Sequence, residues 1–487
     1  MRARILSITV VALVAVAIAV PPAMSGAAPT AWRQKVASQV LRDTAGGESA
    51  SFVVMLASQA DLSAAASLPI KLAKGRFVFD TLRAAAARAQ APIRAMLDRS
   101  GVEYRAHWIV NLVTVVRGDR ALVRALAMRP DVARIDVNDW VRSSVLPTGP
   151  SVPEARSAAP AGIEWNVRKV KAPMVWSHGF TGQGIVVGEI DTGFQWDHPA
   201  LKAHYRGWNG SSVDHNYNWY DEIDPGNRAP VDPSGHGTHT VGTIIGDDGG
   251  TNRIGVAPGA RWIGCRSMNQ DGLGTADTYI GCLEFMVAPF DLDGNNPDPS
   301  KAPAAINNSW FCSISEGECP NQAILLPAVQ DVRAAGIVPV VAAGNSGPFC
   351  QTIGIDGPPA QYDESLTVGA ITNENGLATF SSRGPASFQG TRIKPDMVAP
   401  GEYVRSSWPP STYSIESGTS TASPHIVGVI ALIYSAKPSL IGNVDATEQL
   451  IERTAQHFNS SECASSGSFP NNLYGWGLVN AGRAAKP

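Results

Sequence analysis

Three short segments of this 487-residue chain hold residue types that together can perform nucleophilic chemistry. Asp191 lies in the segment VGEIDTG, His236 in GHGTH and Ser420 in GTSTASPH. Such a set lets a serine hydroxyl attack a carbonyl while an imidazole takes its proton and a carboxylate orients the imidazole. The surrounding small residues let backbone and substrate come close. We therefore expect Asp191, His236 and Ser420 to be catalytic, with no metal among the site residues.

The order of these residues along the chain narrows the class of enzyme. Chymotrypsin-like enzymes run His, Asp, Ser and α/β-hydrolases run Ser, Asp, His, whereas this chain runs Asp, His, Ser. A secreted esterase would have Gly-x-Ser-x-Gly around its nucleophile, which the segment around Ser420 lacks.

Each motif taken alone has a plainer interpretation. The segment DTG occurs in aspartic proteases, which need two copies, and it also suits an ordinary turn. The segment around Ser420 would serve as a helix cap. His239 follows His236 at helical spacing, but the Glu of a His-Glu-x-x-His zinc motif is missing, so we expect His239 to be a buried structural residue.

Asn345 is a fourth candidate, in the segment VAAGNSG at the end of an apolar run. Its side-chain amide could donate to the oxygen of a tetrahedral intermediate. The alternative is a turn asparagine with left-handed backbone.

Short apolar runs flanked by glycine predict the elements that position these residues. Several runs are apolar on both faces, as a parallel sheet covered by helices requires. We expect buried strands at 185–190, 261–265, 304–306, 337–343 and 365–368. Asp191 then lies at the carboxyl end of a strand, where open α/β sheets place their sites. Helices should begin at His236 and, with the apolar run HIVGVIALIY, just after Ser420. The predicted architecture is a three-layer α/β fold with a mostly parallel sheet.

Residues 28–142 predict a separate small α+β domain. We expect strands at 51–56, 108–116 and 132–137, and helices at 81–99 and 119–128. Residues 143–163 are rich in Pro, Ser, Gly and Ala, which indicates an exposed linker where maturation cleavage would occur. An unrelated small α/β domain is the alternative interpretation of residues 28–142.

The first 27 residues predict a signal peptide. A basic start, MRAR, is followed by the apolar run 5–20 and by small residues at 25–27. That run is short for a membrane span, so we expect a secreted, extracellular product without a membrane anchor.

Charge is divided between the two parts of the chain. Residues 1–150 hold 19 Lys and Arg against 10 Asp and Glu, and the remainder holds 20 against 32. A basic N-terminal domain could therefore fold onto an acidic second part. Nucleic-acid binding is not expected, because the arginines are scattered along Ala-rich sequence without interleaved aromatic residues.

The six cysteines form an even set in a chain expected to be exported, which favours disulfides over buried free thiols. Cys312 with Cys319 is the easiest pair to close, and the remaining pairing stays open. No Cys-x-x-Cys pair is present to suggest zinc.

Together these motifs resemble the subtilase family of subtilisin-like serine proteases (peptidase S8), and further segments extend the match over roughly 165–482. They occur in family order: IGVAPGA, FSSRGP, KPDMVAPG and YGWGLVN. The segments GEIDTG, HPAL and NNSW are closest to the bacillopeptidase F branch. The resemblance implies a subtilisin-like catalytic domain at 164–487. It also implies that residues 28–142 are an inhibitor-like, ferredoxin-like propeptide.

The resemblance also implies how substrate binds. A protein or peptide substrate would lie as an added strand between Gly272-Leu273-Gly274 and the segment that begins Ser309-Trp310. Gly344 and Ser309 would border the pocket for the side chain before the scissile bond, and Asn345 would help bind the oxyanion. The chain's own propeptide would be its intramolecular chaperone and inhibitor, and the enzyme would be a monomer.

Two departures from the family pattern limit this transfer. Ala200 stands where many subtilisins have an Asp that ligates calcium, and the loop 247–253 lacks the usual ligand insert. The run 291–295 is rich in oxygen ligands, but its Gly does not stand where an EF-hand calcium loop has one, so it is weak evidence for another calcium site. We expect no cofactor for catalysis, and structural calcium is not supported at the usual tight site. Phe311-Cys312 replace the glycines that relatives have after Asn-Ser-Trp, which alters the substrate-side wall.

The leading hypothesis is a secreted serine endopeptidase that is made as an autoprocessed zymogen and works through an acyl-enzyme on Ser420. The competing hypothesis is a catalytically silent binding protein on the same fold. Such a protein would be expected to have lost one of its catalytic or oxyanion residues, and all four are present.

Overall fold

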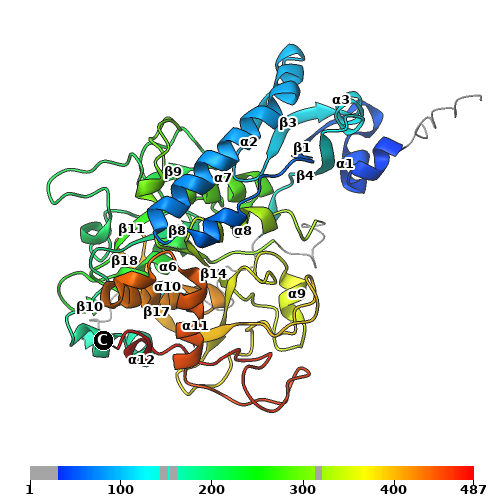
Figure 1. The fold of residues 1–487 in the computed structure, drawn as a ribbon. Helices are drawn as coiled ribbons and strands as arrows, with labels where there is room; N and C mark the ends of the chain where they lie inside the picture. Colours follow the sequence, from blue (N-terminus) through cyan, green and yellow to red (C-terminus); the bar gives the residue numbers. More distant parts are fainter. Residues whose placement is uncertain (1–30, 143–151, 154–161, 313–320, 487) are drawn as a thin grey trace, which may run out of the picture.

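The computed structural model describes residues 31–142, 152–153, 162–312 and 321–486 of the chain (Figure 1). Its centre is a seven-stranded sheet of order β16-β15-β14-β13-β8-β11-β9, in which every neighbouring pair is parallel. The strands are β8 (Val186–Asp191), β9 (Trp219–Asp221), β11 (Arg261–Arg266), β13 (Ala305–Asn308), β14 (Val338–Ala342), β15 (Leu366–Ile371) and β16 (Met397–Pro400).

Helices cover both faces of this sheet, which confirms the predicted three-layer α/β fold. One face packs on α5 (Ala172–Trp176), α6 (His236–Ile245), α10 (Thr419–Ala436), α11 (Val444–Thr454) and α12 (Ala481–Ala484). The other face packs on α7 (Ala276–Val287) and α8 (Leu326–Ala334). Each face of the sheet forms its own hydrophobic core with the helices that cover it. Side chains of β8 point into both cores: Val187 packs in the core with α6 and α10, and Ile190 in the core with α7 and α8.

Smaller elements complete this part of the chain. The edge strand β12 (Leu273–Gly274) pairs with β5 (Val141–Arg142), and β17 (Val404–Trp408), β18 (Thr412–Glu416) and β6 (Val152–Pro153) form a separate sheet. The remaining elements are β7 (Gly162–Ile163), β10 (Asn252–Arg253), α4 (Trp165–Lys169) and α9 (Thr352–Asp356).

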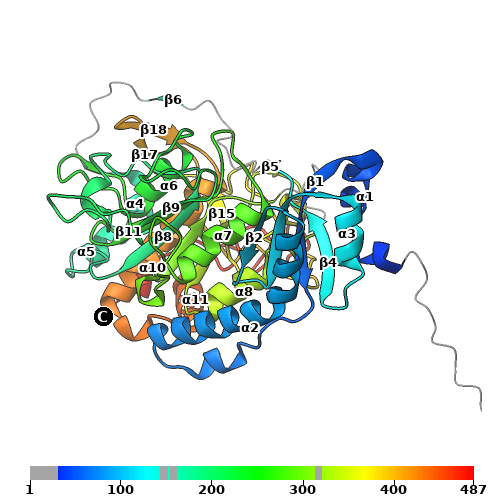
Figure 2. The ribbon, with the colours of Figure 1, turned by 90° about the horizontal axis from the view of Figure 1, so that it is seen from above.

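The N-terminal part forms its own four-stranded antiparallel sheet of order β2-β3-β1-β4 (Figure 2). Its elements are α1 (Ser38–Asp43), β1 (Ser49–Leu56), α2 (Lys71–Arg99), β2 (Tyr104–His107), β3 (Leu112–Asp119), α3 (Arg120–Ala127) and β4 (Val132–Val137). From β1 onward the order is βαββαβ, the ferredoxin-like α+β arrangement predicted for residues 28–142.

Two boundaries predicted in this domain were wrong. The predicted strand 108–116 begins too early, because residues 108–111 form a turn and the strand there, β3, runs from Leu112 to Asp119; β2, just before the turn, was not predicted. The predicted helix 81–99 begins much earlier, at Lys71, and α2 continues through Pro92 to Arg99. Apolar residues recur along the extra turns of α2, but Gly and Lys between them weakened the helical pattern.

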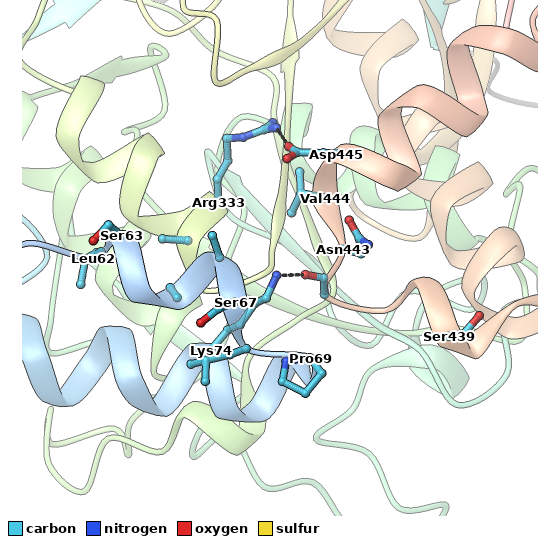
Figure 3. Close-up of a pocket in the computed structure, with 15 residues that line it drawn as sticks. Leu62, Ser63, Ser67, Pro69, Lys74, Arg333, Ser439, Asn443, Val444 and Asp445 are labelled. Carbon is cyan, nitrogen blue, oxygen red and sulfur yellow. Dashed lines mark hydrogen bonds and ion pairs between the residues drawn. The ribbon is translucent and has the colours of Figure 1, made fainter.

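The extension of α2 docks on the second part of the chain, away from the paired strands β5 and β12. At 29 residues, α2 is about 43 Å long, more than one face of its own sheet needs. The Lys71 ammonium donates to the Ala302 carbonyl (3.1 Å) and the Lys74 ammonium to the Gly442 carbonyl (2.9 Å). A cavity of about 460 Å³ lies beside this contact, between the segment before α2 and the start of α11 (Figure 3).

A second contact joins the two parts through charge. Arg105 on β2 pairs with Asp277 (2.7 Å) and with Glu222. His107 lies buried between Asp277 (2.6 Å) and Glu284 (3.3 Å) of α7. The basic N-terminal domain therefore meets the acidic second part as its charge predicted.

Two disulfides lie among the described residues. Cys265 of β11 is bonded to Cys282 of α7, and Cys350 is bonded to Cys463. The favoured partner of Cys312, Cys319, lies outside the described residues.

The predicted signal peptide (1–27) also lies outside the described residues. So does most of the predicted linker, 143–163, in which we expect the cleavage site. Among the residues that the structure does describe, no helix is long and apolar enough to cross a membrane.

Candidate active site

Asp191 and His236 meet at the carboxyl end of β8, each placed by an element boundary. Asp191 is the last residue of β8 and His236 the first residue of α6, after Gly235 with a positive φ of 96°. The His236 Nδ1 lies 2.7 Å from Asp191 Oδ1. Both side chains are almost fully buried. This contact fixes the ring so that Nε2 faces away from the carboxylate.

The electrostatics of the pair favour a protonated imidazole. Burial lowers the pKa of His236, but the charge of Asp191 and its hydrogen bond outweigh burial, so the pKa lies above its ordinary value of 6.5. The Nε2 atom is buried and has no hydrogen-bond partner among the described residues. An imidazole that gains a proton at Nε2 is therefore stabilised.

Asp232 is a residue that the sequence analysis did not single out, and it shapes the turn before α6. Its carboxylate accepts from the backbone N–H groups of Gly235 (2.8 Å) and Thr238 (2.8 Å). It also accepts from the hydroxyl of Thr192, the residue after Asp191 (3.0 Å). Asp232 thus ties the loop after Asp191 to the helix that begins at His236. The run Asp-Pro-Ser-Gly, typical of a turn leading into a helix, was the available signal.

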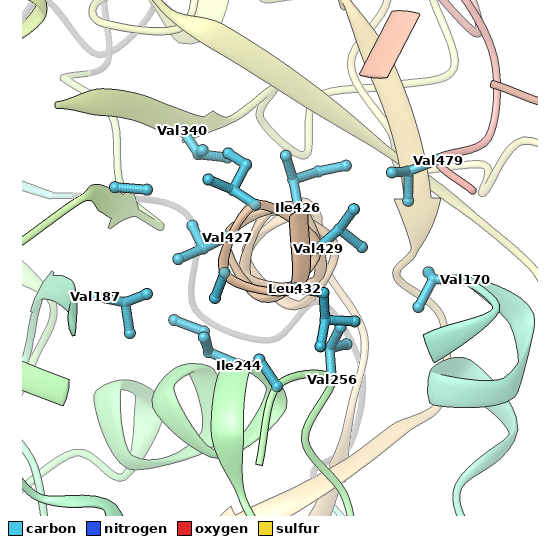
Figure 4. Packing of buried hydrophobic residues seen from close by; sticks show 14 of the residues in the cluster. Val170, Val187, Ile244, Val256, Val340, Ile426, Val427, Val429, Leu432 and Val479 are labelled. Carbon is cyan, nitrogen blue, oxygen red and sulfur yellow. The ribbon is translucent and has the colours of Figure 1, made fainter. Parts of the chain in front are cut away.

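Ser420 is the second residue of α10, where backbone N–H groups at a helix start lack partners within the helix. The helix itself is buried almost throughout. Figure 4 looks along α10 and shows valine, leucine and isoleucine side chains surrounding it on every side. A buried helix of this kind holds the serine at a fixed place relative to the sheet.

Asn345 follows the end of β14 and faces the start of α10. Its Oδ1 accepts from the backbone N–H (2.9 Å) and the hydroxyl (3.0 Å) of Thr419. These bonds assign the amide orientation and turn Nδ2 away from Thr419. The Nδ2 atom is buried and without a partner among the described residues.

Gly418 lies beside the Asn345 amide and the start of α10, and its lack of a side chain leaves space there. A Cβ at Gly418 would lie 2.8 Å from Ser420 Oγ, 3.5 Å from Asn345 Nδ2 and 3.6 Å from Ser420 N. One point is therefore near a nucleophile and near two hydrogen-bond donors. Glycine leaves this point open, so a reacting carbonyl oxygen can approach it.

A buried polar network lies close to the same residues. The Ser309 hydroxyl donates to the Ser420 carbonyl (2.9 Å), and Asn307 Nδ2 donates to Ser309 Oγ (2.8 Å) and to Glu189 Oε1 (2.7 Å). Burial, and then the charge of Asp191, raise the pKa of Glu189 well above its ordinary value. Glu189 is thus held neutral near Asp191, a role that its place in an apolar run did not reveal.

The predicted substrate-binding residues lie in and before β12, after β13 and after β14. Gly272 precedes β12, and Leu273 and Gly274 form it, pairing antiparallel with Arg142 and Val141 of the chain's own N-terminal part. Trp310 is buried and stacks on Tyr279 of α7 with ring centroids 3.9 Å apart. Ser309 and Gly344, the predicted borders of the pocket, reach the start of α10 through Ser420 and Thr419.

His239 lies where a structural residue was predicted. It is buried, and its Nε2 lies 3.0 Å from the Val404 carbonyl. Burial lowers its pKa to about 3, which keeps the ring neutral. His239 is therefore separate from the acid–base pair.

Comparison with known proteins identifies the family. The sequence profile of the subtilase family matches residues 182–477, more than half of the chain. The chain belongs to the subtilase family. This membership confirms the resemblance found in the motifs and supports a serine peptidase.

Three relatives share about a third of their aligned residues with this subtilase, over different shares of their own length. Bacillopeptidase F of Bacillus subtilis (strain 168) is 34% identical over 479 residues, covering 92% of this chain and 32% of that protein. Subtilisin BL and subtilisin Savinase of Lederbergia lenta are each 32% identical over 324 residues, covering 66% of this chain and 99% of each protein. The subtilase therefore spans about a third of bacillopeptidase F and nearly the whole of the two subtilisins. The bacillopeptidase F match also extends well before residue 182, into the N-terminal domain.

The described part of this subtilase holds no group of three or more His, Cys, Asp or Glu side chains arranged to bind a metal ion. The prediction that structural calcium is unsupported at the usual tight site stays untested.

Proposed function

We propose that this subtilase is a secreted serine endopeptidase, with Ser420 as nucleophile, His236 as general base and then acid, and Asp191 as the group that orients His236. Asn345 Nδ2 and the Ser420 backbone N–H would bind the oxyanion. The observation that carries the proposal is the open point over Gly418, which lies near Ser420 Oγ and both of these donors.

Acylation follows from this geometry. A peptide carbonyl placed over Gly418 is attacked by Ser420 Oγ, whose proton passes to His236 Nε2. The resulting imidazolium is stabilised by Asp191, and the carbonyl oxygen, now negative, receives hydrogen bonds from the two donors. His236 returns its proton to the leaving amine, and the C–N bond breaks to leave an ester on Ser420.

Deacylation reverses these roles. His236 takes a proton from water, and the hydroxide formed attacks the ester at the same point over Gly418. Collapse of the second tetrahedral intermediate gives the carboxylic acid, and the proton held by His236 restores the Ser420 hydroxyl. Neither step calls for a cofactor.

We propose that the N-terminal domain is an inhibitory propeptide. Its β5 pairs with β12, the edge strand on which a substrate would lie, so the domain competes with substrate for main-chain hydrogen bonds. Cleavage within 143–163 would then free this edge. We further propose that the enzyme works on protein and peptide substrates as a monomer.

Secretion is supported by the basic and apolar start of the chain and by its disulfides, which persist in oxidising compartments. We propose an extracellular enzyme on these grounds.

Active-site labelling tests the proposal. A fluorophosphonate probe should label the matured wild-type protein at Ser420, shown by peptide mass mapping, and labelling should vanish in Ser420→Ala and after heat denaturation. The labelled protein should lose its ability to hydrolyse casein. If the folded wild-type protein neither labels nor cleaves casein, the alternative, a catalytically silent binding protein, replaces the proposal.

A further inference from the structure

We propose that Asp356 is a positioning residue for the oxyanion donor Asn345, acting through Ser346 and Ser382. This inference rests on the proposed function and adds to it a group that does not touch the substrate. Asp356 is the last residue of α9 and is 1% exposed.

The carboxylate joins two segments that come from different parts of the chain. Asp356 Oδ1 accepts from the Ser346 hydroxyl and Oδ2 from the Ser382 hydroxyl. Ser382 in turn accepts from the Ser346 backbone N–H (2.9 Å) and donates its own N–H to the Gly344 carbonyl (3.0 Å). The residues before and after Asn345 are therefore both held by one network.

Close packing couples Asp356 directly to the backbone of this loop. Gly344 has a positive φ of 103°, and a Cβ there would lie only 2.0 Å from Asp356 Oδ2. The carboxylate thus rests against the backbone of the residue before Asn345. A change in the position or charge of the Asp356 carboxylate must therefore alter the backbone of the loop that holds Asn345.

The side-chain amide of Asn345 is fixed separately from its backbone. Thr419 holds the Oδ1 of the amide, while Asp356 and its two serines hold the backbone. Both constraints are needed to aim Nδ2 at the point over Gly418. Misplacement by about 1 Å at a reacting centre can cost on the order of 10²-fold in rate.

A carboxylate suits this task better than a neutral side chain. Among the described residues no cation pairs with Asp356, and Arg383, the residue after Ser382, pairs instead with Glu462 (3.4 Å). Burial raises the pKa of Asp356 to about 6, against the effect of the two serine hydrogen bonds, so the group is ionised at neutral pH. Only the ionised form accepts from both hydroxyls without donating. An apolar residue would fill the same space at lower cost but would leave both serines unpaired.

A double-mutant cycle tests whether Asp356 acts through Asn345. The variants Asp356→Ala, Asn345→Ala and the double variant are made in the full chain. A site for an added, removable protease is placed in the linker, so that maturation does not depend on the variants' own activity. Active sites are counted by fluorophosphonate labelling, and kcat and KM are measured on a fluorogenic peptide.

We expect Asp356→Ala to lower kcat by about 10- to 100-fold with KM within about twofold. In the Asn345→Ala background the same change should alter kcat by less than about threefold, because the donor it positions is gone. Ser382→Ala should lower kcat in the same direction, and Asp356→Asn, which keeps one acceptor oxygen, should retain more activity than Asp356→Ala.

Asp331→Ala is the matched control, since burial also raises the pKa of Asp331, to about 8, but the residue lies on α8 and none of its contacts in the described structure is with Ser346, Ser382 or Asn345. Its kcat per labelled site should be unchanged.

Three results would overturn the inference while leaving the proposed function intact. Equal losses in the two backgrounds would mean that Asp356 acts independently of Asn345. A selective loss on peptides with Lys or Arg before the cleaved bond would make Asp356 a specificity residue. A fall only in the labelled fraction, with unchanged kcat per site, would make it structural. An inactive wild-type protein would instead refute the proposed function.

Discussion

At the scale of single residues, the candidate site depends on groups whose charge is set by their neighbours. Asp191 and Glu189 lie two residues apart on β8, yet burial and the charge of Asp191 keep Glu189 neutral. Asp232 and Glu416 also raise the pKa of His236 through their charge, but less than Asp191 does. Asp191 is therefore the main cause that raises the pKa of His236.

The pH dependence of activity should report the pKa of His236, which burial lowers and the charge of Asp191 raises. His236 must be neutral to accept the serine proton, so activity falls as pH drops through its pKa, which lies above 6.5 in the intact pair. In Asp191→Asn, burial remains and the opposing charge is lost, so the acid limb should move below pH 6.5. The same variant should lower kcat by on the order of 10⁴-fold, because the tautomer is no longer fixed.

The measurement is kcat/KM from pH 5 to 10, normalised to labelled active sites. An acid limb that stays in place in Asp191→Asn, or a kcat within tenfold of wild type, would contradict the assigned role of Asp191.

The sequence was enough to propose the residues with direct chemical roles, but not the residues that hold them in place. Asp191, His236, Asn345 and Ser420 each lie in a short motif with distinctive neighbours. Asp232 and Asp356 act through contacts with residues that are close only after folding. A single sequence contains no signal for such contacts beyond local turn patterns.

At the scale of elements, the short edge strand β12 pairs with β5, and it is the edge that we propose substrate and propeptide share. Gly274 is needed there because a Cβ would lie 2.6 Å from Cζ of Tyr279 and 2.8 Å from the Ser267 carbonyl. Tyr279 in turn stacks on Trp310, so this edge rests on a buried aromatic pair.

Gly274→Ala should therefore displace the edge strand and weaken peptide binding. We expect KM to rise about 10-fold while kcat per labelled site stays within about threefold, since the change affects ground state and transition state alike. Steady-state kinetics on a fluorogenic peptide measures this effect.

Gly376→Ala is the control, because Gly376 is exposed and its Cβ would meet only ordinary contacts at 3.5 Å. A Gly274→Ala enzyme with unchanged KM would show that β12 does not bind the substrate.

Elements were predictable where composition was unambiguous. The buried strands of the central sheet read as apolar runs, and β8, β11, β13, β14 and β15 lie where such runs were found. The edge strand β9 and the outer strand β16 were missed, because Trp219–Asp221 and Met397–Pro400 are short and carry Asp or Pro. The separation of β2 from β3 depends on contacts with α7, which no local pattern shows.

At the scale of the whole molecule, the two parts meet at a buried charge cluster. Glu284 accepts from the backbone N–H groups of Trp108 and, at 2.9 Å, Ile109, while its other oxygen faces His107. Burial lowers the pKa of His107, but Glu284 and Asp277 outweigh it and raise the pKa to about 10. Arg105 completes the cluster by pairing with Asp277 and Glu222.

For the N-terminal domain that we propose as a propeptide, this cluster predicts that retention after cleavage depends on pH. The bound form takes up a proton that a released His107, with an ordinary pKa of 6.5, would lose near neutrality. The contribution of His107 to binding is complete below pH 6.5 and declines as pH rises toward 10. In His107→Gln, dissociation of the cleaved propeptide should be about 10- to 100-fold faster at pH 6, and the difference from His107 should narrow by pH 9.

The comparison is made in Ser420→Ala chains cut in the linker by an added protease, with retention followed by size-exclusion chromatography. Comparing the two chains at each pH cancels the effect of other groups, including Lys71, whose pKa burial lowers to about 8. A pH-independent difference between the chains would exclude His107 as the source.

The fate of the unprocessed precursor distinguishes a self-processing serine peptidase from a catalytically silent protein. Wild-type and Ser420→Ala chains are expressed side by side, and the intact mass of each is followed after folding. We expect the wild-type chain to lose its first 140 to 160 residues by cleavage in the linker, while Ser420→Ala stays at full length under identical conditions. A Ser420→Ala chain that matures alone at the wild-type rate, or a folded wild-type chain that never matures, would contradict a self-processing serine peptidase.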